Sequence, residues 1–263
     1  MTIWEMVAVV AAGFAAGGIN AVVGSGTLVT FPVLLTVGLP PVTATVSNSI
    51  GLVTGSIAGI VGYRRELRGQ RPLLVRLIPA SVLGAVTGAF LLLNLPAEAF
   101  ETIVPALVGL AVVLVLVQPF LQRALARKRA RDGVVEPEQL RIGPGRLAGL
   151  LAGAYATGTY GGYFAASQGV LQIGIFGLLL PESLQRLNAM KNVLAGCVNA
   201  VAGLTYGLVA SDRISWPAVG LVAVGSVAGG YVGSTFGRRL PPPVLRAAIV
   251  LLGLVAIGVL LSR

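Results

Sequence analysis

The chain has 263 residues, of which 56% are hydrophobic and only 11% charged, and its mean hydropathy is +0.89. Soluble domains carry about 25% charged residues, so this composition indicates an integral protein of the cell membrane. The net charge of +10 does not indicate nucleic-acid binding, because the basic residues lie between apolar runs, as in cytoplasmic loops. With no histidine and one cysteine, Cys197, the sequence predicts no metal site, disulfide or cofactor.

Ten apolar runs follow one another, five before and five after a charged stretch at residues 122–146. They predict an all-α polytopic membrane protein. We expect residues 1–121 and 147–263 to form two related transmembrane units, and the charged stretch, which contains two prolines, to be a cytoplasmic loop. The runs cover residues 3–23, 27–39, 43–62, 77–94, 102–120, 147–160, 163–180, 187–210, 217–236 and 244–262.

Residues 158–192 contain an interrupted apolar segment, around which the rest of the chain is organised. Its two apolar pieces are each about 14 residues long, whereas a hydrocarbon core of about 30 Å needs about 20 helical residues. Backbone that is not helical at membrane depth persists only where protein or water satisfies its polar groups. The interruption therefore predicts a binding site.

The two halves share the order of their glycines and polar residues. Gly24-Ser25-Gly26 aligns with residues 160–162, and Asn48 with Asn192. If each interrupted segment is a hairpin, 17 of the 19 Lys and Arg residues face the cytoplasm, against 14 when each half crosses four times. The positive-inside rule therefore favours two inverted repeats, each with one broken or re-entrant segment and three full spans, and with both termini outside. Interrupted helices in inverted repeats are typical of secondary transporters with a midplane site.

Several stretches resemble a known family. In the second half these are YGGYFAASQG at 160–169, LQRLNAMKN at 184–192 and CVNAVAG at 197–203. In the first half they are Gly24-Ser25-Gly26, FPVLL at 31–35 and GLPP at 38–41. With these stretches the chain resembles the TauE/SafE family of membrane transporters over nearly its whole length. The resemblance implies export or uptake of sulfite, sulfoacetate or other organosulfonates, although the usual Gly-Gly-Gly of the first repeat reads Gly-Ser-Gly here.

The predicted site combines backbone and side-chain donors for an anion. Glycines at the two interruptions, near 24–26 and 159–162, would let N–H groups converge at helix starts. Asn188, Lys191, Asn192, Ala195 and Asn199 share one helix face. The asparagines either line the site or tie helices together, and Lys191 either contacts the anion or extends to the interface. The predicted substrate-binding residues are Gly24, Ser25, Gly26, Asn48, Thr159, Gly161, Gly162, Gln168, Lys191, Asn192 and Asn199.

All nine carboxylates lie at chain ends or in expected loops, so the sequence predicts neither an enzyme site nor a carboxylate proton relay. We expect a secondary transporter of small anions that works by alternating access between the repeats. The alternative is a channel-like anion pore built from the same broken helices. The expected partners are a small anion and the lipid bilayer, with H⁺ and Na⁺ both open as coupling ions and the oligomeric state unassigned.

Overall fold

The computed structural model describes residues 1–131, 142–236 and 242–261. These residues form ten α-helices and one short 3-10 helix, with no strand among them, which confirms the all-α prediction. Six of the described helices, α1, α3, α4, α5, α8 and α9, are long and apolar enough to cross a membrane. The helices are α1 (Ile3–Val22), α2 (Thr27–Thr36), α3 (Pro41–Gly62), α4 (Arg71–Asn94), α5 (Ala97–Arg131), α6 (Pro144–Tyr163), α7 (Gln168–Leu179), α8 (Leu184–Val209), η1 (Ser211–Arg213), α9 (Trp216–Phe236) and α10 (Pro242–Leu261).

Local signals at the helix starts explain several of these bounds. Thr2 and Glu5 form a capping box at α1, in which the Glu5 amide donates to Thr2 Oγ1 at 3.3 Å and the Thr2 amide donates to Glu5 Oε2 at 2.8 Å. Pro41 and Pro144 begin α3 and α6, where the missing amide hydrogen costs nothing. These signals account for the starts of α1, α3 and α6.

The charged stretch at 122–146 differs from the predicted loop at both of its ends. α5 continues to Arg131, and α6 already begins at Pro144. Residues 122–131 contain only Gln, Arg, Ala, Leu and Lys, which are strong helix formers. Charge ends the apolar span there but does not end the helix. The middle of the stretch, 132–141, lies outside the described residues, and its cytoplasmic placement stays a prediction.

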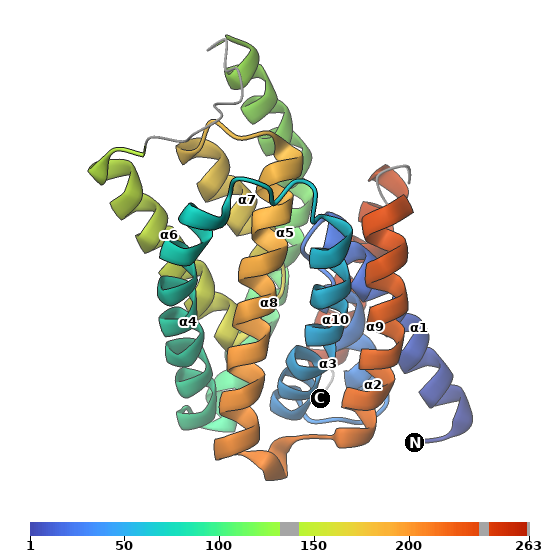
Figure 1. Ribbon diagram of the computed structural model, residues 1–263. Helices are drawn as coiled ribbons and strands as arrows, with labels where there is room; N and C mark the ends of the chain where they lie inside the picture. Colours follow the sequence, from blue (N-terminus) through green and yellow to red (C-terminus); the bar gives the residue numbers. More distant parts are fainter. Residues whose placement is uncertain (132–141, 237–241, 262–263) are drawn as a thin grey trace.

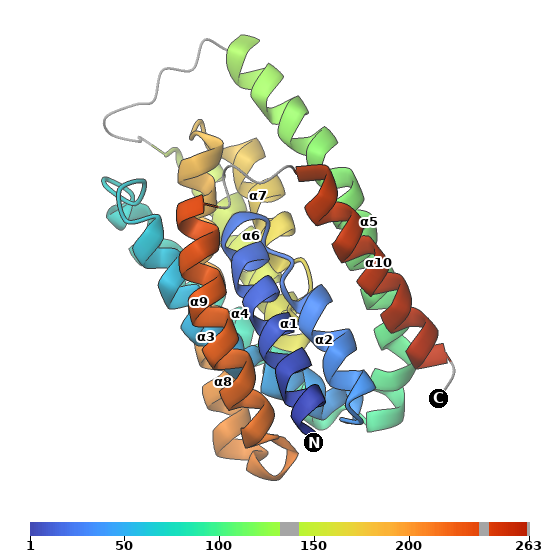
Figure 2. The same ribbon diagram turned by 90° about the vertical axis from the view of Figure 1, so that its right-hand side faces the viewer.

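The two interrupted segments form helical hairpins. α1 and α2 are joined by residues 23–26, and α6 and α7 by residues 164–167. α1 begins at the lower end in Figures 1 and 2, whereas α6 begins at the upper end, and α3 and α8 also run in opposite directions. These directions are the ones that inverted repeats require, while the repeat relation and the membrane sidedness stay predictions.

Small residues bring the long helices close together. A Cβ atom on Gly225 of α9 would lie 2.7 Å from the Phe14 amide nitrogen of α1. In the same way, a Cβ atom on Gly84 of α4 would lie 2.8 Å from the Thr159 amide nitrogen of α6. Gly225 and Gly84 therefore serve close helix packing.

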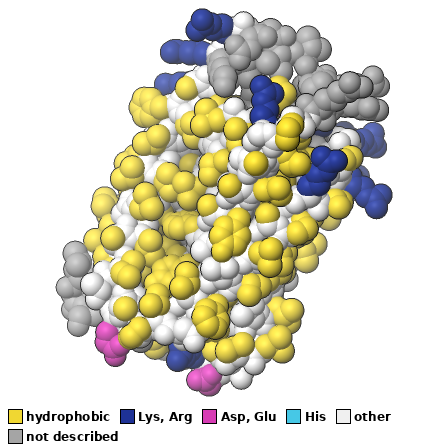
Figure 3. Space-filling view, turned by 90° about the vertical axis from the view of Figure 1, so that its left-hand side faces the viewer, with side chains coloured by type: hydrophobic (Ala, Val, Ile, Leu, Met, Phe, Trp, Pro, Cys, Tyr) yellow, Lys and Arg dark blue, Asp and Glu magenta, His cyan; other side chains and the backbone are white. Residues whose placement is uncertain are grey.

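Basic side chains gather at one end of the molecule, and a broad apolar surface separates this end from the other (Figure 3). The α3–α4 and α7–α8 loops meet there. Gln70 Nε2 donates to the Arg186 carbonyl at 3.1 Å, and Arg186 Nη1 donates to the Arg68 carbonyl at 3.0 Å. The two loops therefore lie on one side of the bilayer, as the charge argument requires. Lys191 was one of the 17 basic residues expected to face the cytoplasm, but it lies inside the protein in α8.

Candidate functional site

The two helix breaks contact each other in the interior of the bundle. The Gly169 amide donates to the Gly24 carbonyl at 3.2 Å. A Cβ atom on either glycine would lie 2.6 Å from the Cα atom of the other, so only glycine permits this approach. Gly24 also has φ of +88°, a conformation that residues with a Cβ rarely adopt.

The second break begins five residues later than predicted. The prediction placed it at 159–162, but α6 is continuous to Tyr163 and the turn occupies 164–167. Ala165 and Ser167 have φ of 65° and 59°, which is uncommon for residues with a Cβ. The predicted residues Thr159, Gly161 and Gly162 are therefore helical residues of α6.

Side-chain hydrogen bonds hold this unusual turn. Tyr160 Oη donates to the Ala166 carbonyl at 2.6 Å, and Ser167 Oγ donates to the Ala111 carbonyl of α5 at 3.1 Å. These bonds help offset the strain of two left-handed residues, which is about 1–3 kcal/mol each. Helix α5 also supports the first break, because Gln118 Nε2 donates to the Val23 carbonyl at 3.4 Å.

Of the three predicted residues in α6, only Gly161 adjoins the second break. A Cβ atom on Gly161 would lie 2.7 Å from Gln168 Nε2, so this glycine makes room for the Gln168 side chain. A Cβ atom on Gly162 would lie 2.9 Å from Ala85 Cα of α4. Thr159 Oγ1 donates to the Tyr155 carbonyl of its own helix at 3.0 Å. Gly162 and Thr159 thus belong to the packing of α6 against α4.

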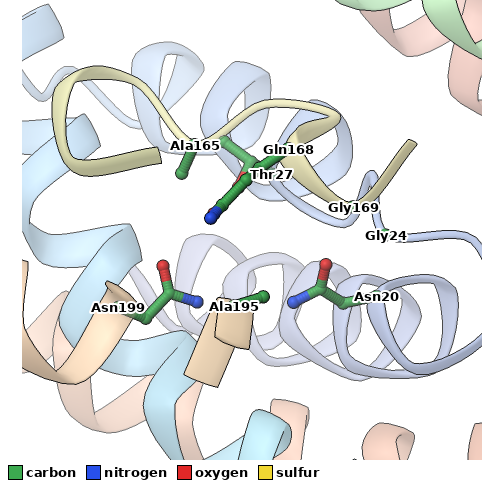
Figure 4. A pocket seen from close by; sticks show the side chains of 8 residues that line it. All are labelled: Asn20, Gly24, Thr27, Ala165, Gln168, Gly169, Ala195 and Asn199. Carbon is green, nitrogen blue, oxygen red and sulfur yellow. The ribbon is translucent and has the colours of Figure 1, made fainter. Parts of the chain in front are cut away.

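A small cavity lies where the two breaks meet α8 (Figure 4). It offers about 10 Å³ to the centre of a water molecule, which is close to the minimum that one water needs. Its walls come from α1, both breaks, the first turns of α2 and α7, and α8. The lining residues are Asn20, Gly24, Thr27, Ala165, Gln168, Gly169, Ala195 and Asn199.

Amide groups face this cavity from three helices. In Figure 4 the side-chain nitrogens of Asn20 and Asn199 are directed toward each other from opposite sides, and that of Gln168 is directed into the same space. Gln168 Nε2 and Asn199 Oδ1 are buried and have no hydrogen-bond partner among the described residues. Buried polar atoms without a partner are rare in folded proteins. The cavity therefore holds hydrogen-bonding capacity that a bound solute could use.

Asn48 acts on the cavity through Thr27. The Asn48 side chain is fully buried, its Nδ2 donates to Thr27 Oγ1 at 3.2 Å, and its Oδ1 accepts from Thr30 Oγ1. Because Thr27 Oγ1 accepts this bond, its own hydrogen can donate toward the cavity. Asn48, predicted as a direct ligand, lies outside the lining and orients a residue within it.

Three other polar side chains of α8 donate to the last carbonyls of α1. Lys191 Nζ donates to the carbonyls of Asn20 at 2.7 Å and Ala21 at 3.4 Å. Asn188 Nδ2 and Asn192 Nδ2 donate to the Ala21 carbonyl at 3.0 and 3.1 Å. These donors satisfy carbonyls that have no partner within α1. Lys191 is only 1% exposed, so of the two alternatives for this residue the extension to the interface is wrong.

The field of the short helices favours negative charge in the cavity. α2 begins at Thr27 and α7 at Gln168, and neither start has a side-chain cap. Helix N-termini carry partial positive charge and unpaired N–H groups. Among the described residues of α1, α2, α7 and α8 the only carboxylate is Glu5, about 22 Å along α1 from Asn20 at 1.5 Å per residue.

The lining of the cavity differs from the predicted site in several residues. Ser25 and Gly26 belong to the first break but do not line the cavity. Asn20, Thr27, Ala165 and Gly169 line it and were not predicted. Asn20 had a usable signal, because an amide within an otherwise apolar helix usually faces protein or water. Ala165 had none, since alanine gives no indication of a left-handed turn.

A multi-pass helical protein whose interrupted helices meet around a buried polar cavity has the architecture of a membrane transporter. The comparison with protein families agrees: the model of the sulfite exporter TauE/SafE family matches residues 9–260. The chain belongs to the TauE/SafE family, which confirms the family predicted from its sequence. Its similar proteins are described as membrane transporters and not as enzymes.

Three relatives share 24–26% sequence identity with the chain. The chain is 26% identical over 248 residues to the probable membrane transporter protein ORF9 of Sinorhizobium sp, covering 92% of this chain and 87% of that protein. It is 25% identical over 241 residues to the probable membrane transporter protein YfcA of Escherichia coli K12, with coverages of 91% and 83%. For YdhB of Bacillus subtilis the identity is 24% over 223 residues, with 85% of each chain covered. No solved structure matches the chain.

Proposed function

We propose that the chain carries a small anion, of the sulfite or organosulfonate class, by alternating access at the cavity between the two breaks. The observation that carries the proposal is the convergence of amide nitrogens from Asn20, Gln168 and Asn199 on one buried space. The N-terminal ends of α2 and α7 reach the same space. The family described as sulfite exporters supplies the class of anion.

The donors suit an anion that must also be released. Each hydrogen bond to a charged group contributes about 1.5–3 kcal/mol, so a few amides and helix ends offset part of the lost hydration. An arginine fork would hold an oxyanion more tightly, and transport requires a site that is favourable to reach and still easy to leave. Neutral amides and helix ends meet both requirements.

The size of the cavity supports a transporter over the channel-like pore. Its volume of about 10 Å³ for the centre of a water molecule is too small for a hydrated anion. Gly169 and Gly24, which both line it, are joined by a backbone hydrogen bond. We infer that an anion enters when the breaks move apart, a movement that would be a step of alternating access.

Uptake into proteoliposomes tests the proposal. Purified protein is presented with sulfite, sulfoacetate, acetate and choline, with and without a pH gradient or a sodium gradient. We expect saturable uptake of a sulfur oxyanion and acceleration by the same anion on the opposite side. Flux that rises in proportion to the gradient without counter-exchange would favour the pore. Transport of choline alone would refute the anion proposal.

Two pairs of matched variants connect transport to the cavity. Thr27→Val removes a hydroxyl that faces the cavity, whereas Thr159→Val removes one that is bonded within α6. Asn199→Leu removes a lining amide, whereas Asn94→Leu removes an exposed one at the end of α4. We expect the first member of each pair to raise KM and the second to leave KM unchanged. Equal effects within both pairs would argue against this cavity as the site.

A further inference from the structure

We propose that the Lys191 ammonium is a tethered cation that fills a cation site at the C-terminal end of α1. The site consists of backbone carbonyls at a helix break, and the lysine stands where a free metal ion would otherwise bind. Broken-helix transporters use such helix ends and unwound carbonyls to hold Na⁺. In this chain the ammonium group of Lys191 takes the place of the ion.

Lys191 Nζ contacts two backbone carbonyls at the end of α1. The Asn20 and Ala21 carbonyls accept from Nζ at 2.7 and 3.4 Å. Asn192 and Asn188 donate to the second of these carbonyls and so fix the end of the helix. The negative end of the α1 dipole lies at this point and favours a cation.

Lys191 has no ion-pair partner among the described residues, although it is 1% exposed. A buried charge ordinarily requires an opposite charge, and the nearest helices supply none, since Glu5 is at the far end of α1 and Glu182 pairs with Arg186. Carbonyl dipoles are therefore the compensating groups. The ammonium is thus held by backbone carbonyls, as a cation at a helix C-terminus is, and not by a salt bridge among the described residues.

The stem of Lys191 runs between the two breaks and occupies the space beside the carbonyls. A Cβ atom on Gly24 would lie 3.1 Å from Lys191 Cδ, and one on Gly169 would lie 2.6 Å from it. The side chain thus blocks this position against ions from solution. Sodium is consequently not needed to hold the breaks together, and any coupling ion must act elsewhere.

Thermal unfolding of the purified full-length chain tests the proposal and requires no substrate, so it is independent of the proposed anion transport. Lys191→Ala empties the site and leaves room for an ion, whereas Lys191→Met keeps the stem and loses the charge. We expect both variants to lower Tm by about 5 °C or more. Sodium chloride or ethylammonium chloride should restore the Tm of Lys191→Ala but not that of Lys191→Met. Choline chloride at equal ionic strength is the reference salt. Arg127→Ala removes an exposed charge from α5 and should respond to none of these salts.

Two results would overturn the tethered cation. One is a Lys191→Ala protein whose Tm is the same in sodium, ethylammonium and choline. The other comes from Lys191→Gln, which can still donate a hydrogen bond but has no charge, and which remains available should the alanine variant not fold. Wild-type Tm for Lys191→Gln would mean that a neutral donor suffices. A Tm as low as that of Lys191→Met supports the requirement for a cation.

Discussion

The substitution Gln168→Leu should weaken anion binding without weakening the fold. Gln168 Nε2 faces the cavity and has no partner among the described residues, so its hydrogen bond is available to the solute. Loss of a bond to a charged group costs about 1.5–3 kcal/mol, which corresponds to about a 10- to 100-fold weaker affinity. Leucine has a similar volume and leaves no buried donor unsatisfied, so the free energy of unfolding should stay equal or rise by about 1 kcal/mol.

Initial rates of sulfite uptake over a range of concentrations give KM and the maximal rate, and thermal unfolding of the same preparation gives Tm. Gln168→Glu is the matched variant, because it keeps the shape and places an acidic group beside the solute. We expect its KM to rise at least as much as that of Gln168→Leu. The reasoning fails if Gln168→Leu keeps a wild-type KM, or if its Tm falls together with its transport.

Three further predictions concern packing, burial and topology. Gly162→Ala should destabilise the fold by about 1–3 kcal/mol, because its Cβ would press on the backbone of α4. Gly109→Ala, with no atom within 4 Å of the new Cβ, should instead stabilise the fold by about 0.5–1 kcal/mol. Equal denaturation midpoints for the two variants would contradict this prediction. Gln172 is fully buried with both amide atoms unpartnered among the described residues, so Gln172→Leu should raise Tm, and a lower Tm would show that the amide has a partner. In intact cells, an impermeant thiol reagent should label a cysteine at Thr2 and miss one at Arg127, and the reverse pattern would exclude the predicted orientation.

Much of the fold could be predicted because the bilayer imposes a simple rule on sequence. Apolar runs of helical length had to become helices, and the run at 43–62 did so as α3 from Pro41 to Gly62. The basic residues at the end of α5 continue the helix, because arginine and lysine have helix propensities close to that of leucine. Hydropathy reports where a span ends, and helix propensity reports where a helix ends.

The site was harder to predict because one residue type serves two purposes. Glycine permits both a break and a close helix contact, and the sequence near Gly161 and Gly162 does not distinguish them. The actual turn uses Ala165 and Ser167, and it is held by a hydrogen bond from Tyr160 of α6 and by one that Ser167 donates to α5. Lys191 was predicted as a substrate-binding residue from its helix face, but its partners are backbone carbonyls, which leave no signature in a sequence.

The contact between Gly24 and Gly169 couples the stabilities of the α1–α2 and α6–α7 hairpins. Each glycine is required because the other backbone is so near, and Gly24 also because of its positive φ. Once a methyl group at one position has forced the backbones apart, a second methyl at the other position meets less resistance. The effects of Gly24→Ala and Gly169→Ala should therefore be less than additive, with a coupling energy of about 0.5–3 kcal/mol in a double-mutant cycle. A substitution in one half of the chain thus changes which residues the other half can accept.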